Sequence, residues 1–389
     1  MQVLLSTVFL ILAVLPVIGA TYDFSPVNDI VSQGIGRGAY PGAQLLIGTD
    51  DGIIFEKSYG NYTYDEFSPT VTDESIYDLA SVTKVVATTA AVMKLYEAGL
   101  IDLNSNVSKY LPEFTSYGKE DITVLNLLLH NSGLDAFVPF FTMYTKRSEV
   151  LSHIYSMNLS YPAGSKTVYS DLNAILLGEI VESVSKQSLD EYCSVNIFIP
   201  LGMRSTCFNP QGKLLELAVP TEKDEYWRMK QLKGEVHDEA AYLMGGVSGN
   251  AGLFSNSKDI YRLLKTLLKK GVYYDFDSSK EMRMFEASTV ELFTKRFEGL
   301  QYDNTRALGW ETKPNMESKY RIACGEMISE NCFGHTGYTG TSIWCDADRN
   351  LIVIFLTNRV FPTRNNNLIR DIRPDLHNAV INAFDKNKE

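Results

Sequence analysis

A serine and a lysine three residues apart, Ser81 and Lys84, are the residues of this sequence best placed to do chemistry together. If a helix begins at Ser81, the i, i+3 spacing puts the hydroxyl and the amine on one face of that helix. The free N–H groups at the helix start favour a developing oxyanion, and apolar neighbours favour loss of the lysine charge. The pattern therefore predicts a nucleophile with a general base beside it.

The same Ser-x-x-Lys spacing occurs at three other places, so spacing alone does not identify a catalytic pair. These places are Ser116–Lys119, Ser183–Lys186 and Ser255–Lys258. The first lies in an expected loop and the second near the end of a helical stretch. Serines before the amphipathic run 260–268 are typical of helix caps. A helix cap followed by a solvated lysine is the competing interpretation of Ser81 as well.

Two distant motifs carry groups that would complete the chemistry. Tyr169-Ser170-Asp171 stands where a loop becomes a helix, and His335-Thr336-Gly337 lies on an expected strand. A tyrosine near a lysine can accept or relay a proton. The glycine lets a substrate approach the backbone, and the N–H of Tyr338 would complete an oxyanion hole with that of Ser81. Taken singly, each motif also fits an ordinary role: a half-buried aromatic, a helix cap or a strand histidine.

The composition excludes one class of partner. The chain has 389 residues, of which 45% are hydrophobic, so it can bury a large core in one large domain or two interleaved domains. Its net charge is −11, and its basic residues cluster only at Arg228–Lys233 and Lys269-Lys270. We therefore expect no nucleic-acid partner.

The first residues indicate export. Residues 3–18 are almost wholly apolar and Gly19-Ala20 are small, which is typical of a secretory signal peptide spanning 1–20 and cut near Ala20. The alternative is an uncleaved anchor, but about 16 apolar residues are short for a membrane span. We therefore expect a secreted or lumenal protein without a stable membrane anchor after cleavage. Three glycosylation sequons fit that location: Asn61-Tyr-Thr63, Asn106-Val-Ser108 and Asn158-Leu-Ser160.

Five cysteines leave at least one thiol unpaired within the chain: Cys193, Cys207, Cys324, Cys332 and Cys345. The pairs Cys193–Cys207 and Cys324–Cys332 would each close a short loop and are the first candidates for disulfides. Buried free thiols are the alternative. The cysteines lack the spacing and the histidine partners of a zinc site, so no metal is expected.

Strand patterns occur at both ends of the chain, with helical patterns between them. A hairpin is expected over 43–60, and further strands over 308–310, 333–338, 341–345 and 351–357. Helices are expected from Ser81 to near Gly99 and over 172–185, 257–270, 287–296 and 375–384. The stretch 201–244 is irregular and polar, and a glycine-dense run follows at 245–252.

These patterns predict an α/β protein of the α+β type, with a mostly antiparallel sheet built from both chain ends and flanked by helices. Residues 21–80 and 290–389 would form the sheet domain, and residues 81–289 an inserted, mainly helical domain. Small-ligand sites usually lie in the cleft between such domains.

Together the motifs resemble those of the penicillin-recognising serine hydrolases, above all class C β-lactamases and their relatives among DD-peptidases and esterases. Ser81-Val-Thr-Lys84, Tyr169-Ser-Asp171 and His335-Thr-Gly337 follow the order and broad spacing of that family. The similarity covers roughly residues 25–385. It implies the β-lactamase/transpeptidase-like fold, with Ser81 acylated and Lys84 and Tyr169 sharing the general-base work.

The sequence departs from the family pattern at two positions. Asp171 replaces an asparagine that contacts the substrate amide, and the added anion would keep Lys84 protonated. His335 replaces a lysine before Thr336-Gly337; because histidine titrates near pH ~6.5, its grip on a substrate carboxylate would weaken above that pH.

Two functions follow from this resemblance. The first is an exported serine hydrolase that forms an acyl-enzyme on a small molecule or short peptide: a D-amino-acid peptide, a β-lactam-like compound or a short acyl ester. The second is a non-catalytic protein that binds acyl or peptide ligands, or assembles, without turnover. The resemblance implies no cofactor, and the sequence leaves the oligomeric state open.

Overall fold

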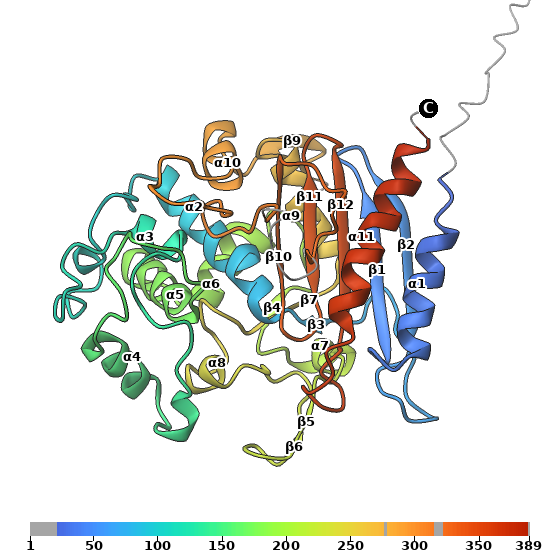
Figure 1. Ribbon diagram of the computed structural model, residues 1–389, viewed down its shortest axis with the longest axis horizontal. Coiled ribbons are helices and arrows are strands. Elements are labelled where there is room, and N and C mark those ends of the chain that lie inside the picture. Colours follow the sequence, from blue (N-terminus) through green and yellow to red (C-terminus); the bar gives the residue numbers. More distant parts are fainter. Residues whose placement is uncertain (1–21, 276–277, 315–321, 388–389) are drawn as a thin grey trace, which may run out of the picture.

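A computed structural model describes residues 22–275, 278–314 and 322–387. Its main element is a five-stranded antiparallel sheet in the order β10-β11-β12-β1-β2 (Figure 1). The strands come from both chain ends: β1 (Gly42–Gly48), β2 (Ile53–Gly60), β10 (Cys332–Thr336), β11 (Ser342–Asp346) and β12 (Leu351–Thr357). The predicted fold class is confirmed.

Helices cover both faces of this sheet. The side chains of β1 and β12 are all buried, as a central strand with two covered faces requires. On one face Leu45 and Phe355 pack with α1 (Ser25–Gly36) and α11 (Ile369–Asp385). On the other face Leu46 and Ile354 belong to the core that includes α9 (Ser257–Leu268). Successive side chains of these strands point to opposite faces of the sheet, so each strand contributes to two separate hydrophobic cores.

Most of the remaining helices lie beyond β10, on the side of the sheet away from β2 (Figure 1). The helices are α2 (Ala90–Glu97), α3 (Val124–Leu128), α4 (Arg147–Ser156), α5 (Asp171–Ser185), α6 (Leu189–Cys193), α7 (Gly212–Leu217), α8 (Glu239–Leu243) and α10 (Ala287–Thr294). A three-stranded sheet in the order β3-β7-β4 consists of β3 (Tyr77–Asp78), β7 (Leu253–Ser255) and β4 (Cys207–Phe208). Two small hairpins are β5 (Lys223–Asp224) with β6 (Lys230–Gln231), and β8 (Val272–Asp275) with β9 (Lys280–Arg283).

The expected helix after Ser81 is present, but it begins irregularly. A 3₁₀ turn (Ala80–Val82) leads into a π-helical segment (Lys84–Thr89) that continues as α2. Every residue of the π-helical segment is buried, including its lysine and threonines. Wide π-type turns inside helices occur frequently at functional sites.

The structure corrects one expected strand and decides between the two alternatives for the cysteines. Residues 308–310 form a turn and not a strand, because Gly309 adopts a positive φ of 82° and Ala307 bonds back to the carbonyl of Trp310. Neither candidate disulfide is present: all five cysteines are free thiols, the alternative that the sequence left open. Cys193 is buried and donates to the carbonyl of Ala87 over 3.6 Å, so it behaves as a core residue.

The domain division at residues 81 and 290 stays a prediction. The helix α9 lies between those residues in the sequence, yet it packs against β1 and β12 of the main sheet. The expected signal peptide lies outside the described residues. Within the residues that the structure describes, no helix has the length and apolarity needed to span a membrane.

A buried histidine of α11 provides a test of this packing. His377 is 1% exposed, and burial together with the neighbouring Arg373 lowers its pKa from 6.5 to about 3. Between these two pH values His377 is protonated in the unfolded chain but not in the folded chain. Lowering the pH therefore favours the unfolded chain and reduces the stability of the protein. Relative to a His377→Gln variant, the wild type should lose about 1.4 kcal/mol of unfolding free energy per pH unit below 6.5.

Urea unfolding of both proteins at pH 7, 6 and 5 would measure this difference. Two stability curves that run parallel over that range would show that His377 is accessible to protons in the folded state.

Candidate active site

A short 3₁₀ turn presents Ser81 at the wall of a cavity of about 460 Å³. The turn follows β3, whose Asp78 carboxylate accepts a hydrogen bond of 2.8 Å from the N–H of Ala80. Ala80 has a φ of +47°, a left-handed conformation that costs energy for a residue with a side chain. The strand therefore ends in a strained turn directly before the expected nucleophile.

Lys84 lies under this turn with its ammonium group fully bonded. Its Nζ donates to Ser81 Oγ over 3.0 Å, to Asp171 Oδ1 over 2.7 Å and to the carbonyl of Asn250 over 2.9 Å. These three bonds use all three N–H donors of the group, and the residue is 3% exposed. Burial by itself lowers the pKa of Lys84, but Asp171 and Tyr169 outweigh it and raise that pKa above its ordinary value. Lys84 is therefore an ammonium ion at neutral pH.

The other three Ser-x-x-Lys pairs do not place the lysine amine on the serine hydroxyl. Lys119 Nζ donates to the backbone carbonyls of Ser116 and Tyr155. Ser183 Oγ donates to a backbone carbonyl, and Lys258 forms an ion pair with Asp73. The cap of the helix at residue 257 is Asn256, not either neighbouring serine. Geometry thus separates Ser81–Lys84 from its three sequence matches.

Tyr169 reaches the same site from the segment before α5. Its ring centroid lies 5.1 Å from Lys84 Nζ and 4.9 Å from the ring of His130. Its hydroxyl is buried and makes no hydrogen bond of standard geometry within the described ranges. Burial raises the pKa of Tyr169, and the nearby Lys84 and Ser81 only partly offset this effect. Tyr169 is therefore a phenol at neutral pH.

With an ammonium at Lys84 and a phenol at Tyr169, both groups of the resting pair are protonated, so neither can accept a further proton. One of the two groups must lose a proton before the pair can take the proton of Ser81. Which group loses it is a property of the coupled pair. The rate of attack by Ser81 should therefore rise with pH until that proton is gone.

The third motif packs directly against the backbone that precedes Ser81. Thr341 Oγ1 donates to the carbonyl of Leu79 over 2.9 Å, and Thr339 Oγ1 donates to that of Asp78 over 2.7 Å. A Cβ atom on Gly337 would lie 2.4 Å from the Leu79 carbonyl oxygen, so only glycine fits this approach. Tyr338 follows in the cavity wall with Ser81 and is half exposed. The oxyanion role of the Ser81 and Tyr338 N–H groups stays a prediction.

His335 and Thr336 lie behind the cavity rather than in its wall. His335 is 1% exposed and its Nδ1 donates to the Thr336 carbonyl over 2.8 Å. Burial lowers the pKa of His335 to about 4, and the cations of Arg306 and Lys84 act in the same direction, against Glu311. Because the imidazole is neutral at neutral pH, the geometry gives no support to the expected electrostatic grip on a substrate carboxylate.

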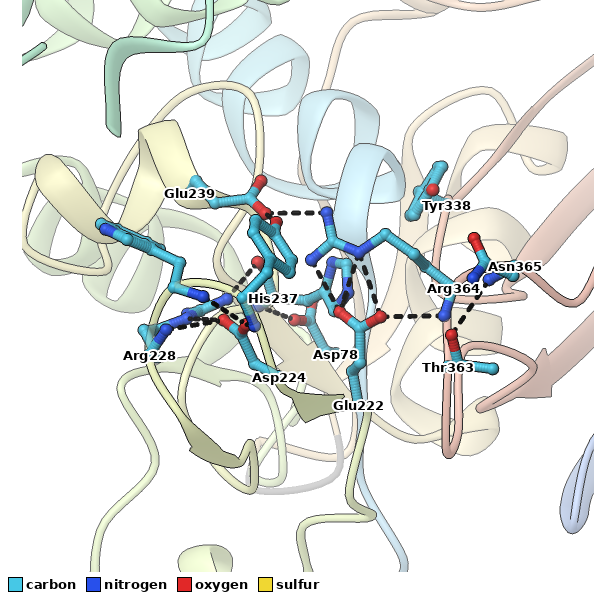
Figure 2. Close-up of polar contacts among 12 residues, drawn as sticks. Asp78, Glu222, Asp224, Arg228, His237, Glu239, Tyr338, Thr363, Arg364 and Asn365 are labelled. Atoms are coloured by element: carbon cyan, nitrogen blue, oxygen red, sulfur yellow. Dashed lines mark hydrogen bonds and ion pairs between the residues drawn. The ribbon is translucent and has the colours of Figure 1, made fainter. Parts of the chain in front are cut away.

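An ion-pair network, drawn in Figure 2, contributes residues to the wall of the cavity. Arg364, from the loop after β12, binds Glu222 over 2.6 Å and Glu239 over 2.8 Å. His237 Nε2 lies 2.9 Å from Glu222, and its backbone N–H donates to Asp78 over 2.7 Å. These bonds lower the pKa of Glu222 to about 2 despite its burial. The network fixes the segment 237–239 against the strand that precedes Ser81.

The analysis of the sequence did not identify this network as part of the site. His237, Asp238, Glu239 and Arg364 all line the cavity. Three consecutive titratable residues just before a glycine-dense run were the available signal, but they lay in a long polar stretch without periodicity. The partner Arg364 is 125 residues beyond Glu239, and no local pattern connects them.

Within the described ranges, no group of three or more His, Cys, Asp or Glu residues is arranged to hold a metal ion.

Comparisons with known proteins show which proteins this chain resembles. The family model described as Beta-lactamase matches residues 27–375. The chain is similar to an N-acetylmuramyl-L-alanine amidase of Bacillus subtilis (strain 168), with 34% identity across 87% of this chain and 82% of that protein. It is also similar to a putative D-alanyl-D-alanine carboxypeptidase of Escherichia coli (strain K12), with 36% identity across 85% of this chain and 80% of that protein.

Solved structures share the fold at lower sequence identity. A penicillin-binding protein homologue from Caulobacter crescentus superposes with a TM-score of 0.71 and 19% identity, covering 92% of this chain and 97% of that chain. EstCE1, a hydrolase with promiscuous acyltransferase activity, superposes with a TM-score of 0.70 and 20% identity, covering 91% of this chain and 97% of that chain. At these identities the likeness shows the fold.

An Asp171→Asn variant should shift the pH dependence of turnover. The amide oxygen can still accept the hydrogen bond from Lys84, but the loss of the anion lowers the pKa of the ammonium. The pH at which kcat/KM for a p-nitrophenyl ester begins to rise should therefore fall by about one to three units. The control is Asp29→Asn, which removes an exposed carboxylate on α1. An unchanged rise would assign Asp171 a purely structural role at the start of α5.

Proposed function

We propose a hydrolytic function for this chain, which belongs to the β-lactamase family of serine hydrolases. In the proposed cycle, Ser81 attacks the carbonyl group of a small amide or ester and forms a covalent acyl-enzyme. The observation that carries the proposal is the 3.0 Å hydrogen bond between Lys84 and Ser81 in the wall of the cavity. The other three Ser-x-x-Lys pairs lack that bond.

Each step of the proposed cycle uses groups present in the site. Ser81 Oγ forms a bond to the carbonyl carbon while its proton passes to the Lys84–Tyr169 pair. The N–H groups of Ser81 and Tyr338 stabilise the negative charge on the carbonyl oxygen. When the bond to the leaving group breaks, the pair returns the proton to the departing amine or alcohol. Water then attacks the acyl-enzyme, the pair transfers the water proton to Ser81 Oγ, and the acid product leaves.

The candidate substrates are D-amino-acid peptides, β-lactam-like compounds and short acyl esters. The two relatives described above are called an amidase and a carboxypeptidase, which supports amides and peptides as the first substrates to test. The neutral, buried His335 supports no charge-based recognition of a carboxylate at that position. Substrates whose carboxylate must be held by a cation at that position, whether β-lactams or peptides with a free C-terminus, are therefore less favoured than neutral amides and esters.

We also propose that residues 1–20 direct the protein out of the cytosol and are removed. The sequon residues Asn106 and Asn158 are exposed on the surface, and Asn61 is partly buried. Exposure of the asparagine is what a glycosylating enzyme requires, so the first two sequons are the better acceptors.

Covalent labelling tests the hydrolytic proposal. A fluorophosphonate or a fluorescent penicillin should add its mass at Ser81 in the folded wild type and nowhere in Ser81→Ala, because the variant lacks the attacking oxygen. Ser116→Ala is a matched control, since it removes an exposed serine of the same motif and should label normally. Turnover of D-Ala-D-Ala peptides, a nitrocefin-type lactam and p-nitrophenyl esters then identifies the acyl donor. Failure of both probes on folded protein would favour the non-catalytic alternative.

Mass spectrometry of the protein from its native cells tests the export proposal. The first residue should be Thr21 or a close neighbour, and glycopeptides should carry modified Asn106 or Asn158. Recovery of peptides that begin at Met1 from the bulk of the protein would contradict it.

A further inference from the structure

The charged side chains in the cavity wall are mostly acidic. Three carboxylates line the cavity, those of Asp171, Asp238 and Glu239, together with one guanidinium, that of Arg364. Asp171 is paired with Lys84 at 2.7 Å, and Glu239 is paired with Arg364 at 2.8 Å. Arg364 cannot supply further positive charge to a ligand, because Glu222 also binds it.

Asp238 is the carboxylate of this wall without a cation. Its hydrogen bonds come from two neutral donors, the N–H of Ala241 at 2.8 Å and Asn250 Nδ2 at 3.0 Å. Both bonds end on Oδ1, so neither uses Oδ2. Among the residues that the structure describes, no lysine, arginine or histidine forms an ion pair with it. Burial and the nearby Asp171 raise the pKa of Asp238 to about 6, so it is still ionised at pH 7 and above.

A helix cap does not explain the charge at this position. Asp238 caps α8 through the bond to Ala241, but asparagine caps helices equally well. A partly buried carboxylate without a counter-ion is unfavourable, and a titratable group perturbed in this way in the wall of a cavity is a candidate for a functional role. The role as a helix cap explains the hydrogen bond to Oδ1 but does not explain why this residue carries a negative charge.

Asp238 lines the same cavity as Ser81 and is connected to Lys84 through Asn250. Asn250 bridges the two, since its carbonyl accepts from Lys84 Nζ over 2.9 Å while its side chain donates to Asp238. Lys84 in turn touches Ser81 Oγ over 3.0 Å. Ser81 and Asp238 both line this cavity, so a substituent of an acyl group on Ser81 shares the cavity with the Asp238 carboxylate. An anionic substituent there would meet the carboxylates of the wall, whereas an ammonium would meet an unpaired one.

We propose that Asp238 is a specificity-determining residue that binds a primary ammonium group next to the scissile carbonyl. The preferred acyl donors are then amides, esters and peptides of amino acids with a free α-amine. This inference rests on the proposed hydrolytic function, because the amine is placed relative to an acyl group that is bound to Ser81.

The test compares alanine p-nitroanilide with N-acetylalanine p-nitroanilide, each in the D and L form, at pH 7. At this pH the α-amine is mostly protonated and Asp238 is mostly ionised. The ratio of kcat/KM, free amine over acetylated, should exceed roughly 10 for the better enantiomer and fall to about 1 in Asp238→Asn. Asp29→Asn, which removes an exposed carboxylate on α1, should keep the wild-type ratio.

A wild-type ratio at or below 1, or a high ratio that survives in Asp238→Asn, would overturn the inference and leave the hydrolytic proposal intact. If Asp238→Asn fails to fold, Asp238→Ser provides a second neutral cap for α8.

A binding measurement separates the inference from turnover. Ser81→Ala protein should bind alaninamide at least ~10-fold more tightly than N-acetylalaninamide by calorimetry, and a Ser81→Ala, Asp238→Asn double variant should not. If no probe labels Ser81 but this preference is present, the hydrolytic proposal fails and the amine site stands. Equal binding of the two amides would overturn the amine site.

Discussion

A single buried ammonium ion holds the candidate site together. A lysine charge inside a protein is tolerated only where its donors are all satisfied and an anion is close. Lys84 meets this requirement through Ser81, Asp171 and the carbonyl of Asn250, which come from three separate parts of the chain. The helix start, α5 and the glycine-dense loop must therefore all be in place before this charge is stable. The same bonds orient the expected nucleophile.

The main sheet reaches the site through backbone carbonyls. Gly337 lies so close to Leu79 that no side chain fits between them, and Thr341 bonds the same carbonyl. On the far side, Arg373 of α11 donates to the carbonyls of Gly337 and Thr341 at 3.0 and 2.8 Å. A helix near the C-terminal end thus supports the turn that presents Tyr338. The predicted oxyanion hole depends on contacts spread over most of the chain.

The sequence was informative where chemistry or periodicity is local. The i, i+3 spacing of Ser81 and Lys84 and the continuous apolar run of β12 predicted elements that the structure contains. Long-range partners were not readable, because a backbone carbonyl such as that of Asn250 has no residue-type signature. The same limit explains why the short loops between cysteines suggested disulfides that the thiols do not form. His335 is similar: its type suggested a cation that titrates near neutral pH, whereas its burial, which no local pattern predicted, lowers its pKa to about 4.

The carboxylates in the cavity wall help to keep the pair formed by Lys84 and Tyr169 protonated. Every carboxylate near Lys84 stabilises its ammonium form, so the cavity opposes the proton loss that attack by Ser81 requires. A substrate with an ammonium group bound at Asp238 would reverse part of this effect, because a nearby cation lowers the pKa of both Lys84 and Tyr169. The free enzyme would then rest in an inactive protonation state, and the correct substrate would help to generate the base that attacks it. A substrate without the amine would bind to the same cavity but meet a site that still carries its extra proton.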